Sequence, residues 1–163
     1  MIAIVMVDEN WAIGKDGDQL CYVPEDLKRF QSLTSNSTIV CGRKTLATFP
    51  GGKPLKNRRN VVLTSDPDFK MAGATVCHSI DEVLDLPYRD MIVVGGQSVY
   101  EQLLPYCNVV HVTKVHKAFA DADAFFPNLD SLPEWYVTEE KGPYQYGDYS
   151  VSFCTYLQEG KKS

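Results

Sequence analysis

Short runs rich in β-branched residues alternate along this chain with stretches that have helical periodicity. The runs expected to be strands are residues 2–7, 38–41, 60–64, 75–78, 91–94, 109–114, 135–140 and 149–157. The expected helices are residues 24–34, 44–48, 80–85 and 98–104. Several strand runs are continuously apolar, as in strands that are covered on both faces. This alternation predicts an α/β fold in which crossover helices pack on a sheet.

The end of the chain departs from this alternation, because two strand runs follow each other without a helix. Residues 135–140 and 149–157 are separated by a Gly-Pro-Tyr segment, which predicts an antiparallel hairpin. In the second run, Val151 and every second residue after it form a more apolar face than Ser152 and its alternates. We expect residues 160–163 to be a frayed tail.

The 163 residues are 44% hydrophobic, which suits one globular domain, residues 1–163, with a sizeable core. No apolar run approaches the length needed to cross a bilayer, and the first residues lack the basic leader of a secretory signal. We therefore expect a cytoplasmic protein without a membrane partner, and a monomer at this size. The net charge of -5 disfavours nucleic acid as a partner, because such binding needs a coherent positive surface.

The 5 cysteines and 3 histidines are scattered along the chain. No two cysteines have CxxC spacing, and their odd number argues against a disulfide framework. We expect most of the cysteines to be buried thiols, and we expect no metal.

Asp26 lies in the only apolar stripe of the expected helix 24–34. At about 100° per residue, Asp26 falls within about 40° of Phe30 and Leu33. Leu27 flanks this stripe. A carboxylate that faces a core is costly unless it has a partner, so Asp26 is either satisfied internally or kept for a ligand. The alternative is ordinary helix-start chemistry, because acidic residues are common after a proline at the first helical position.

Three expected strands end in residues that suit an anion. These segments are Gly42-Arg43-Lys44-Thr45, Thr64-Ser65 and Gly95-Gly96. Glycines let backbone N–H groups approach a phosphate, and cations strengthen its binding. Together the segments could hold the phosphates of a dinucleotide, including an extra ribose phosphate contacted by Arg43. The Gly-Gly pair also fits a tight strand-to-helix connection, and the full GxGxxG fingerprint is absent.

The longest connection runs from Asp8 to Val23 and contains Gly14 and Gly17. A loop of this length in a compact domain is usually functional or mobile. It would lie over the sheet edge where ligands bind in α/β folds, so we interpret it as a lid.

Positive charge is concentrated in the first half of this otherwise acidic chain. The residues are Arg43, Lys44, Lys53, Lys56, Arg58 and Arg59. The cluster suits a small anionic ligand, or it forms a solvated surface.

No Ser-His-Asp or Cys-His arrangement has a spacing that supports nucleophilic catalysis, and no second carboxylate has a plausible buried partner for paired acid–base chemistry. The acidic residues in loops and at strand ends are interpreted as solvated charges. They are Asp8, Asp16, Asp18, Glu139 and Glu140.

Several motifs occur in order along the chain: Ile13-Gly14, Val23-Pro24-Glu25-Asp26-Leu27 through Phe30, Gly42-Arg43-Lys44-Thr45, Gly95-Gly96 through Tyr100, Thr113, and Asp123 through Phe126-Pro127. With this ordered set, the chain resembles the dihydrofolate reductase family over nearly its whole length. The resemblance implies a single domain with an eight-stranded sheet, parallel except for a C-terminal antiparallel strand, and about four flanking helices. It also implies reduction of 7,8-dihydrofolate to tetrahydrofolate by NADPH.

The resemblance implies that Asp26 is the catalytic residue and binds the 2-amino group and N3 side of the pterin ring. The residues it places at dihydrofolate or antifolate inhibitors are Ile4, Val5, Asp26, Leu27, Phe30, Phe49, Leu55, Arg58, Val94, Tyr100 and Thr113. Among these, Arg58 would hold the glutamate α-carboxylate and Thr113 would brace Asp26. We expect Asp26 to raise the basicity of the bound pterin while water beneath the lid protonates N5.

For the cofactor, the resemblance implies contacts with the nicotinamide, the pyrophosphate and the ribose phosphate of NADPH. The residues are Met6, Ile13, Gly14, Gly42, Arg43, Lys44, Thr45, Leu63, Thr64, Ser65, Gly95, Gly96, Gln97, Ser98, Val99 and Tyr100.

One departure from the family pattern lies directly before the helix at residue 24. The family usually has Leu-Pro-Trp there, whereas this chain reads Leu20-Cys21-Tyr22, so that Cys21 takes the place of the tryptophan. Met6, where a smaller residue is common, adds bulk nearby. We predict altered inhibitor binding.

Two other functions remain open on the sequence. The related riboflavin-pathway reductase shares the sheet and the cofactor end, but it should lack the helix carboxylate. A nucleotide-binding module without catalysis would account for Gly95-Gly96 and Arg43 only. Neither explains Asp26, Phe30 and Arg58 together.

Overall fold

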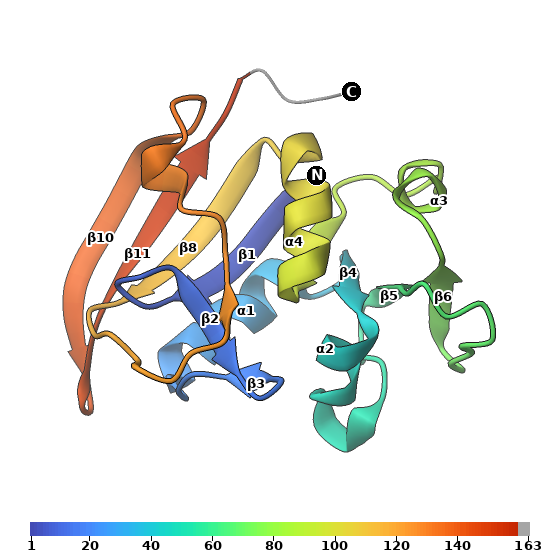
Figure 1. The fold of residues 1–163 in the computed structure, drawn as a ribbon, viewed down its shortest axis with the longest axis horizontal. Helices are drawn as coiled ribbons and strands as arrows, with labels where there is room; N and C mark the ends of the chain where they lie inside the picture. The colour runs from blue at the N-terminus through green and yellow to red at the C-terminus, as the bar shows by residue number, and fades with distance from the viewer. Residues whose placement is uncertain (160–163) are drawn as a thin grey trace.

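An eight-stranded sheet with the order β10-β11-β8-β1-β7-β4-β5-β6 forms the centre of the molecule (Figure 1). The structure is a computed structural model that describes residues 1–159, so the tail expected at residues 160–163 lies outside the described part. The strands of this sheet are β1 (Ile2–Val7), β4 (Thr38–Gly42), β5 (Arg59–Leu63), β6 (Ala74–Cys77), β7 (Ile92–Gly95), β8 (Val109–Val115), β10 (Tyr136–Tyr146) and β11 (Tyr149–Leu157).

The sheet is parallel from β8 to β6, and β11 pairs antiparallel with both β8 and β10. The predicted mixed sheet and C-terminal hairpin are therefore confirmed. The predicted loop at Gly142 and Pro143 is wrong, because β10 continues through both residues with a register shift between Lys141 and Tyr144. The turn of the hairpin is formed by residues 147–148 instead.

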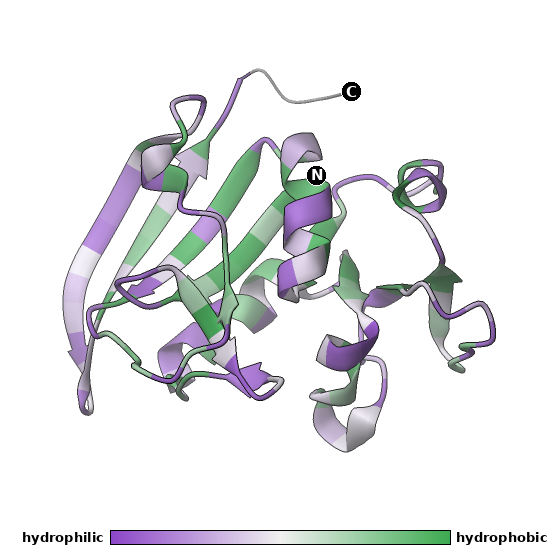
Figure 2. Cartoon of the chain, viewed as in Figure 1, coloured by the Kyte–Doolittle hydropathy of each residue, from purple (hydrophilic) through white to green (hydrophobic). Residues whose placement is uncertain are grey.

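The two faces of β11 are buried in the opposite sense to their polarity. Ser152, Cys154 and Tyr156 are almost fully buried, whereas on the alternate face only Val151 is buried and Phe153, Thr155 and Leu157 are partly buried. The large buried ring of Tyr156 contacts Trp11, with ring centroids 5.8 Å apart. Figure 2 shows the sheet's centre as hydrophobic and β10, its edge strand, as largely hydrophilic.

The four predicted helices are present as α1 (Pro24–Thr34), α2 (Arg43–Ala47), α3 (Ile80–Leu84) and α4 (Gln97–Leu103). Helix α3 begins as expected, because the Ser79 side chain accepts a hydrogen bond from Glu82 N at 3.2 Å. Helices α1 and α4 lie on opposite faces of the sheet (Figure 1). Tyr100 of α4 packs in the large core that contains Val5, whereas Phe30 of α1 packs on the other face.

The segment predicted as an open lid loop is held by short strands. It contains β2 (Ala12–Lys15) and β3 (Asp18–Gln19), and β2 pairs antiparallel with β9 (Ala124–Phe125). Asp8, which was expected to be solvated, is 3% exposed. Its carboxylate accepts hydrogen bonds from the backbone N–H groups of Ala12 and Phe119, each at 2.9 Å. Asp8 therefore joins the start of the lid to a distant loop.

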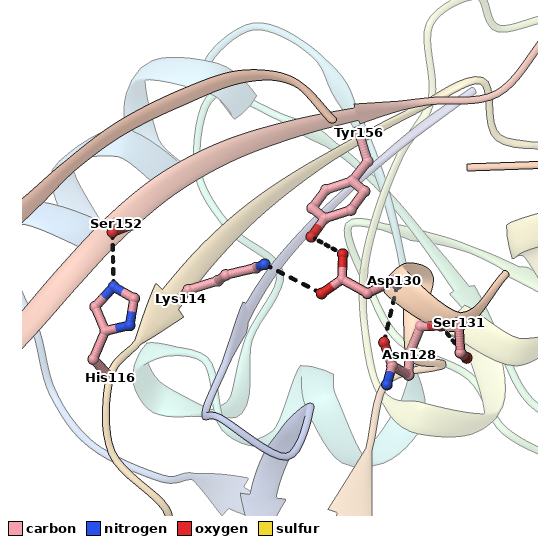
Figure 3. Close-up of polar contacts among 7 residues, drawn as sticks. All are labelled: Lys114, His116, Asn128, Asp130, Ser131, Ser152 and Tyr156. Carbon is pink, nitrogen blue, oxygen red and sulfur yellow. Dashed lines mark hydrogen bonds and ion pairs between the residues drawn. The ribbon is translucent and has the colours of Figure 1, made fainter. Parts of the chain in front are cut away.

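A polar cluster joins the C-terminal strands to the rest of the domain (Figure 3). Tyr156 donates a hydrogen bond of 2.7 Å to Asp130 Oδ1, and Lys114 Nζ lies 3.4 Å from Asp130 Oδ2. A second contact links His116 Nε2 and Ser152 Oγ at 2.7 Å. The two contacts of Asp130 connect β8 and β11 to the 3-10 helix Leu129–Ser131.

All five cysteines are buried and free, as predicted. Within residues 1–159, no cluster of three or more His, Cys, Asp or Glu side chains has an arrangement that could hold a metal ion. No helix in the same range has both the length and the apolar composition to span a membrane.

Candidate functional site

Asp26 lies in the first turn of α1, which begins directly after Val23 with Pro24 at its first position. The helix brings the carboxylate against β8, where the hydroxyl of Thr113 donates a hydrogen bond of 2.6 Å to Asp26 Oδ1. Burial raises the pKa of Asp26, while the Thr113 hydrogen bond and the charge of Arg29 lower it. The carboxylate is thus partly satisfied by one protein donor, and it faces the sheet as the helical period predicts.

An apolar cluster lies beside Asp26 between α1 and the sheet. Its buried members are Ile4, Ile39 and Ile92. The partly buried hydrophobic residues packed against them are Ile2, Phe30, Leu33, Phe49, Leu55 and Val94. Five of the predicted substrate residues are therefore brought together, and most of them keep exposed surface that a flat aromatic ligand could cover.

Three predicted substrate residues lie differently, and one of them, Tyr100, is buried in the large core on the face opposite Asp26. Val5 points to the opposite face of β1 and packs in the large core, so only its backbone remains available to a ligand beside Asp26. Leu27 is 41% exposed and lies outside the apolar cluster. Leu27 directly follows Asp26, so its exposed apolar surface is available to a ligand.

Arg58 is oriented by the far end of α1. Its Nε donates to Thr34 Oγ1 at 3.1 Å and its Nη1 donates to Lys56 O at 2.8 Å. A cavity of about 480 Å³ lies next to it, lined by Asn36, Ser37, Thr38, Asn57, Arg58 and Arg59. A second cavity, of about 420 Å³, lies between the lid and residues 119–122, away from Asp26.

The predicted phosphate-binding segments meet where β7, β4 and β5 end side by side. A Cβ atom at Gly96 would lie 3.3 Å from Thr45 Oγ1, and one at Gly95 would lie 3.4 Å from the same atom. At Gly42, a Cβ atom would lie 3.2 Å from Val99 Cγ2. Gly95 has φ +131, which side chains rarely adopt. At Gly42, Gly95 and Gly96 the backbone therefore lies so close to its neighbours that a side chain would crowd them. We call these three positions the glycine cradle.

Charged and hydroxyl groups surround this cradle. Arg43 Nη1 lies 2.8 Å from Asp66 Oδ2, and its guanidinium lies over the Phe69 ring. Lys44 and Ser65 are exposed. The other cofactor residues expected at these strand ends are Leu63, which is buried, and Thr64, which is partly buried.

Helix α4 links the cradle to the lid and to β1. Gln97 Oε1 accepts a hydrogen bond of 2.8 Å from Phe125 N on β9. Tyr100 donates a hydrogen bond of 2.6 Å to Ile4 O. Ser98, by contrast, is exposed and its hydroxyl accepts from Gln102 Nε2.

The end of β1 and the lid supply the remaining cofactor candidates. Met6 and Ile13 are partly buried, and Gly14 O accepts a hydrogen bond of 3.0 Å from Asp123 N. A Cβ atom at Gly14 would lie 2.7 Å from Asp18 O, so this position needs glycine for the β2–β3 pairing.

Two features of the site were missed on the sequence. Arg29 was not singled out, although it lies one turn after Asp26. Asp8 was expected to be solvated from its place at a strand end, and its partner Phe119 is distant in sequence. A helical wheel marks Arg29 as a neighbour of Asp26, so that signal was present.

The chain is similar to known proteins over nearly its whole length. The family model for dihydrofolate reductase matches residues 1–158. The dihydrofolate reductase of Bacillus subtilis (strain 168) is 38% identical over 151 residues, covering 88% of each chain. That of Staphylococcus haemolyticus is 34% identical over 151 residues, covering 88% of this chain and 89% of the relative.

A solved structure, dihydrofolate reductase from Enterococcus faecalis complexed with NADP(H) and RAB-propyl, superposes with a TM-score of 0.85. It is 35% identical in sequence, and the match covers 96% of this chain and 95% of that chain.

The fold and these relatives place the chain among the α/β oxidoreductases that use a nicotinamide dinucleotide. More particularly, the chain belongs to the dihydrofolate reductase family, whose reaction is the NADPH-dependent reduction of 7,8-dihydrofolate to tetrahydrofolate.

Proposed function

We propose that Asp26 is the residue on which dihydrofolate reduction by this chain depends. Its two carboxylate oxygens match two donors, the 2-amino group and N3 side of the pterin ring. The observation that carries the proposal is the hydrogen bond of 2.6 Å from Thr113, which fixes Asp26 toward the sheet beside the apolar cluster. The apolar cluster and the exposed surface of Leu27 would cover the rest of the pterin and the aminobenzoyl group. Arg58 would pair with the glutamate α-carboxylate.

The glycine cradle fits the pyrophosphate of NADPH, because Cβ atoms at Gly95 and Gly96 would fill the space next to Thr45. When bound, NADPH supplies the hydride that goes to pterin C6. Arg43 would hold the ribose phosphate by exchanging its exposed partner Asp66 for a stronger acceptor. The other proposed cofactor contacts are Met6, Ile13, Gly14, Gly42, Lys44, Leu63, Thr64, Ser65, Gln97, Ser98, Val99 and Tyr100.

Asp26 does not deliver the proton to N5 directly in this proposal. As an anion at the far side of the pterin ring, it raises the basicity of the bound substrate, and water beneath the lid protonates N5. The lid excludes bulk water and aligns the two reacting rings. Burial is consistent with this role, because it strengthens the interaction of the carboxylate with a cationic pterin.

We further propose that the protein acts as a cytoplasmic monomer. Size-exclusion chromatography with light scattering tests the oligomeric state, and a molecular mass twice that of one chain would contradict it.

The direct test of the activity is a spectrophotometric assay of NADPH oxidation. Dihydrofolate should start the oxidation, and a phosphoribosylaminopyrimidine, the substrate type of the related riboflavin-pathway reductase, should not. Binding of NADPH without turnover of either substrate would instead indicate a nucleotide-binding module.

A further inference from the structure

Arg29 is a cation placed one helical turn after Asp26 on α1. Residues three positions apart lie on the same side of a helix, so both side chains are directed toward the sheet. The guanidinium of Arg29 lies over the ring of Phe153, with 4.8 Å from Cζ to the ring centroid. Phe153 is the direct cross-strand partner of Thr113, which donates to Asp26. Arg29 is therefore packed against the same pair of strands that holds the carboxylate.

This arginine lacks the partners that a structural arginine normally has. Its Nη1 is buried and makes no hydrogen bond. Within residues 1–159, no carboxylate oxygen forms an ion pair with it. A buried donor of a charged group that makes no hydrogen bond is costly, so the position of this half-buried arginine one turn from Asp26 calls for an explanation.

We propose that Arg29 is a positioning residue whose positive charge keeps Asp26 ionised while the surrounding apolar cluster takes the carboxylate out of water. This inference rests on the proposed role of Asp26 and adds to it a residue that does not touch the substrate. Where burial reduces screening by water, a cation one helical turn from a carboxylate favours the charged form of that carboxylate.

The other titratable groups around Asp26 and Arg29 come from every element packed against them. They are Cys21 before α1, Glu25 on α1, Tyr100 on α4, His111 on β8, Glu139 on β10 and Cys154 on β11. Burial raises the pKa values of Cys21, Tyr100 and Cys154, so these groups are neutral at neutral pH.

The remaining neighbours do not replace the charge of Arg29. Burial, followed by the charge of Arg29, lowers the pKa of His111, so this histidine is neutral at neutral pH. Glu139 is exposed and forms an ion pair of 3.0 Å with Lys141. Burial lowers the pKa of Arg29, but a guanidinium stays charged throughout the range in which the enzyme works.

The test is a pH titration of Asp26 in the ligand-free protein, followed by the ¹³Cγ chemical shift of labelled aspartate assigned with Asp26→Asn. Arg29→Gln removes the charge with similar side-chain length. We expect the midpoint of the Asp26 titration to rise by at least about 0.5 pH units. The pH profile of turnover should move in the same direction, because loss of a nearby cation favours every protonated form in the site.

Two variants separate charge from packing. Arg29→Lys keeps the charge and should restore the wild-type midpoint to within about 0.2 pH units. Lys28→Gln is the matched control, since it removes a cation from the adjacent position of α1 that is exposed to solvent. Its effect should be below about 0.2 pH units, because water screens that charge.

The proposal is overturned if Arg29→Gln titrates like the wild type, or if Arg29→Lys shifts the midpoint as far as Arg29→Gln. If Arg29→Gln does not fold, Arg29→Met gives the same charge deletion with an apolar side chain that suits the burial. Because the titration needs no substrate, its outcome is separate from the proposed function: Asp26→Asn turnover tests that function even where the Arg29 effect is absent.

Discussion

The hydroxyl of Thr113 on β8 donates a hydrogen bond of 2.6 Å to Asp26 Oδ1 in the first turn of α1. Burial raises the pKa of Asp26, and this hydrogen bond acts against it by stabilising the carboxylate. The contact also fixes the direction of the carboxylate, which a ligand with two adjacent N–H donors requires. The orientation of Asp26 thus depends on one side chain from the sheet, which also favours the ionised carboxylate.

Replacement of Thr113 by valine should weaken substrate recognition. The change keeps the shape of the side chain but removes the donor, and a hydrogen bond to a charged group contributes about 1.5 to 3 kcal/mol. We expect kcat/KM for dihydrofolate to fall by about 10- to 100-fold and the Asp26 titration midpoint to rise. Thr113→Ser keeps the hydroxyl and should stay within a few-fold of the wild type. Equal losses in both variants would contradict this assignment.

The stability of Asp26→Asn should depend on pH in a defined way. The pKa of Asp26 is raised in the folded state, so protonation of its carboxyl group favours the folded protein. This contribution to the free energy of unfolding is complete below about pH 3.8 and is lost as the pH rises through the folded pKa. Asparagine does not ionise, so the variant should have a Tm about 2 to 4 °C higher than the wild type at pH 7. The difference should disappear near pH 3.5. The same substitution at the exposed Asp85 should show no such trend, and a less stable Asp26→Asn at pH 7 would refute the argument.

Cys21→Trp should change both inhibitor binding and stability. Cys21 is 9% exposed and packs with Val23, Val115 and Val151, so the indole must displace neighbours in a filled cluster. We expect overpacking to cost about 1 to 3 kcal/mol in the free energy of unfolding. The trimethoprim inhibition constant should change by at least about fivefold, whereas Cys21→Ala should alter it less. An unchanged constant for the tryptophan variant would argue against contact between this position and the ligand.

Arg43→Gln should weaken NADPH binding selectively. Arg43 is exposed, so its guanidinium can exchange the ion pair with Asp66 for an incoming phosphate. The KM for NADPH should rise by about 10- to 100-fold, and the KM values for NADH and dihydrofolate should change little. The exposed Arg89 provides a control that removes the same charge at a distance. An equal rise for NADH and NADPH would show that Arg43 does not read the ribose phosphate.

Regular elements with clear periodicity could be predicted from the sequence. Helix α1 begins at Pro24 and ends at Thr34 as predicted, because the proline and the spacing of Phe30 and Leu33 are local signals. The direction of Asp26 followed from the same period. The glycine-bearing strand ends could also be predicted, since the parallel sheet brings them to one edge.

Features that depend on distant partners could not be predicted in this way. Strand β2 pairs with β9 across more than a hundred residues of chain, and neither has a pattern long enough to identify it. Asp8 is buried because Phe119 N supplies a donor. Tyr156 is buried because its hydroxyl reaches Asp130. Each polar group is accommodated by a contact that only the folded structure provides.

The most direct test of the account is turnover of Asp26→Asn across the pH range. We expect NADPH oxidation with dihydrofolate to fall by about 10²- to 10³-fold at neutral pH. Part of the loss should be recovered in acid, where the substrate is already protonated. Wild-type turnover of Asp26→Asn at pH 7, with the variant folded, would contradict the central claim that the buried carboxylate binds and activates the pterin.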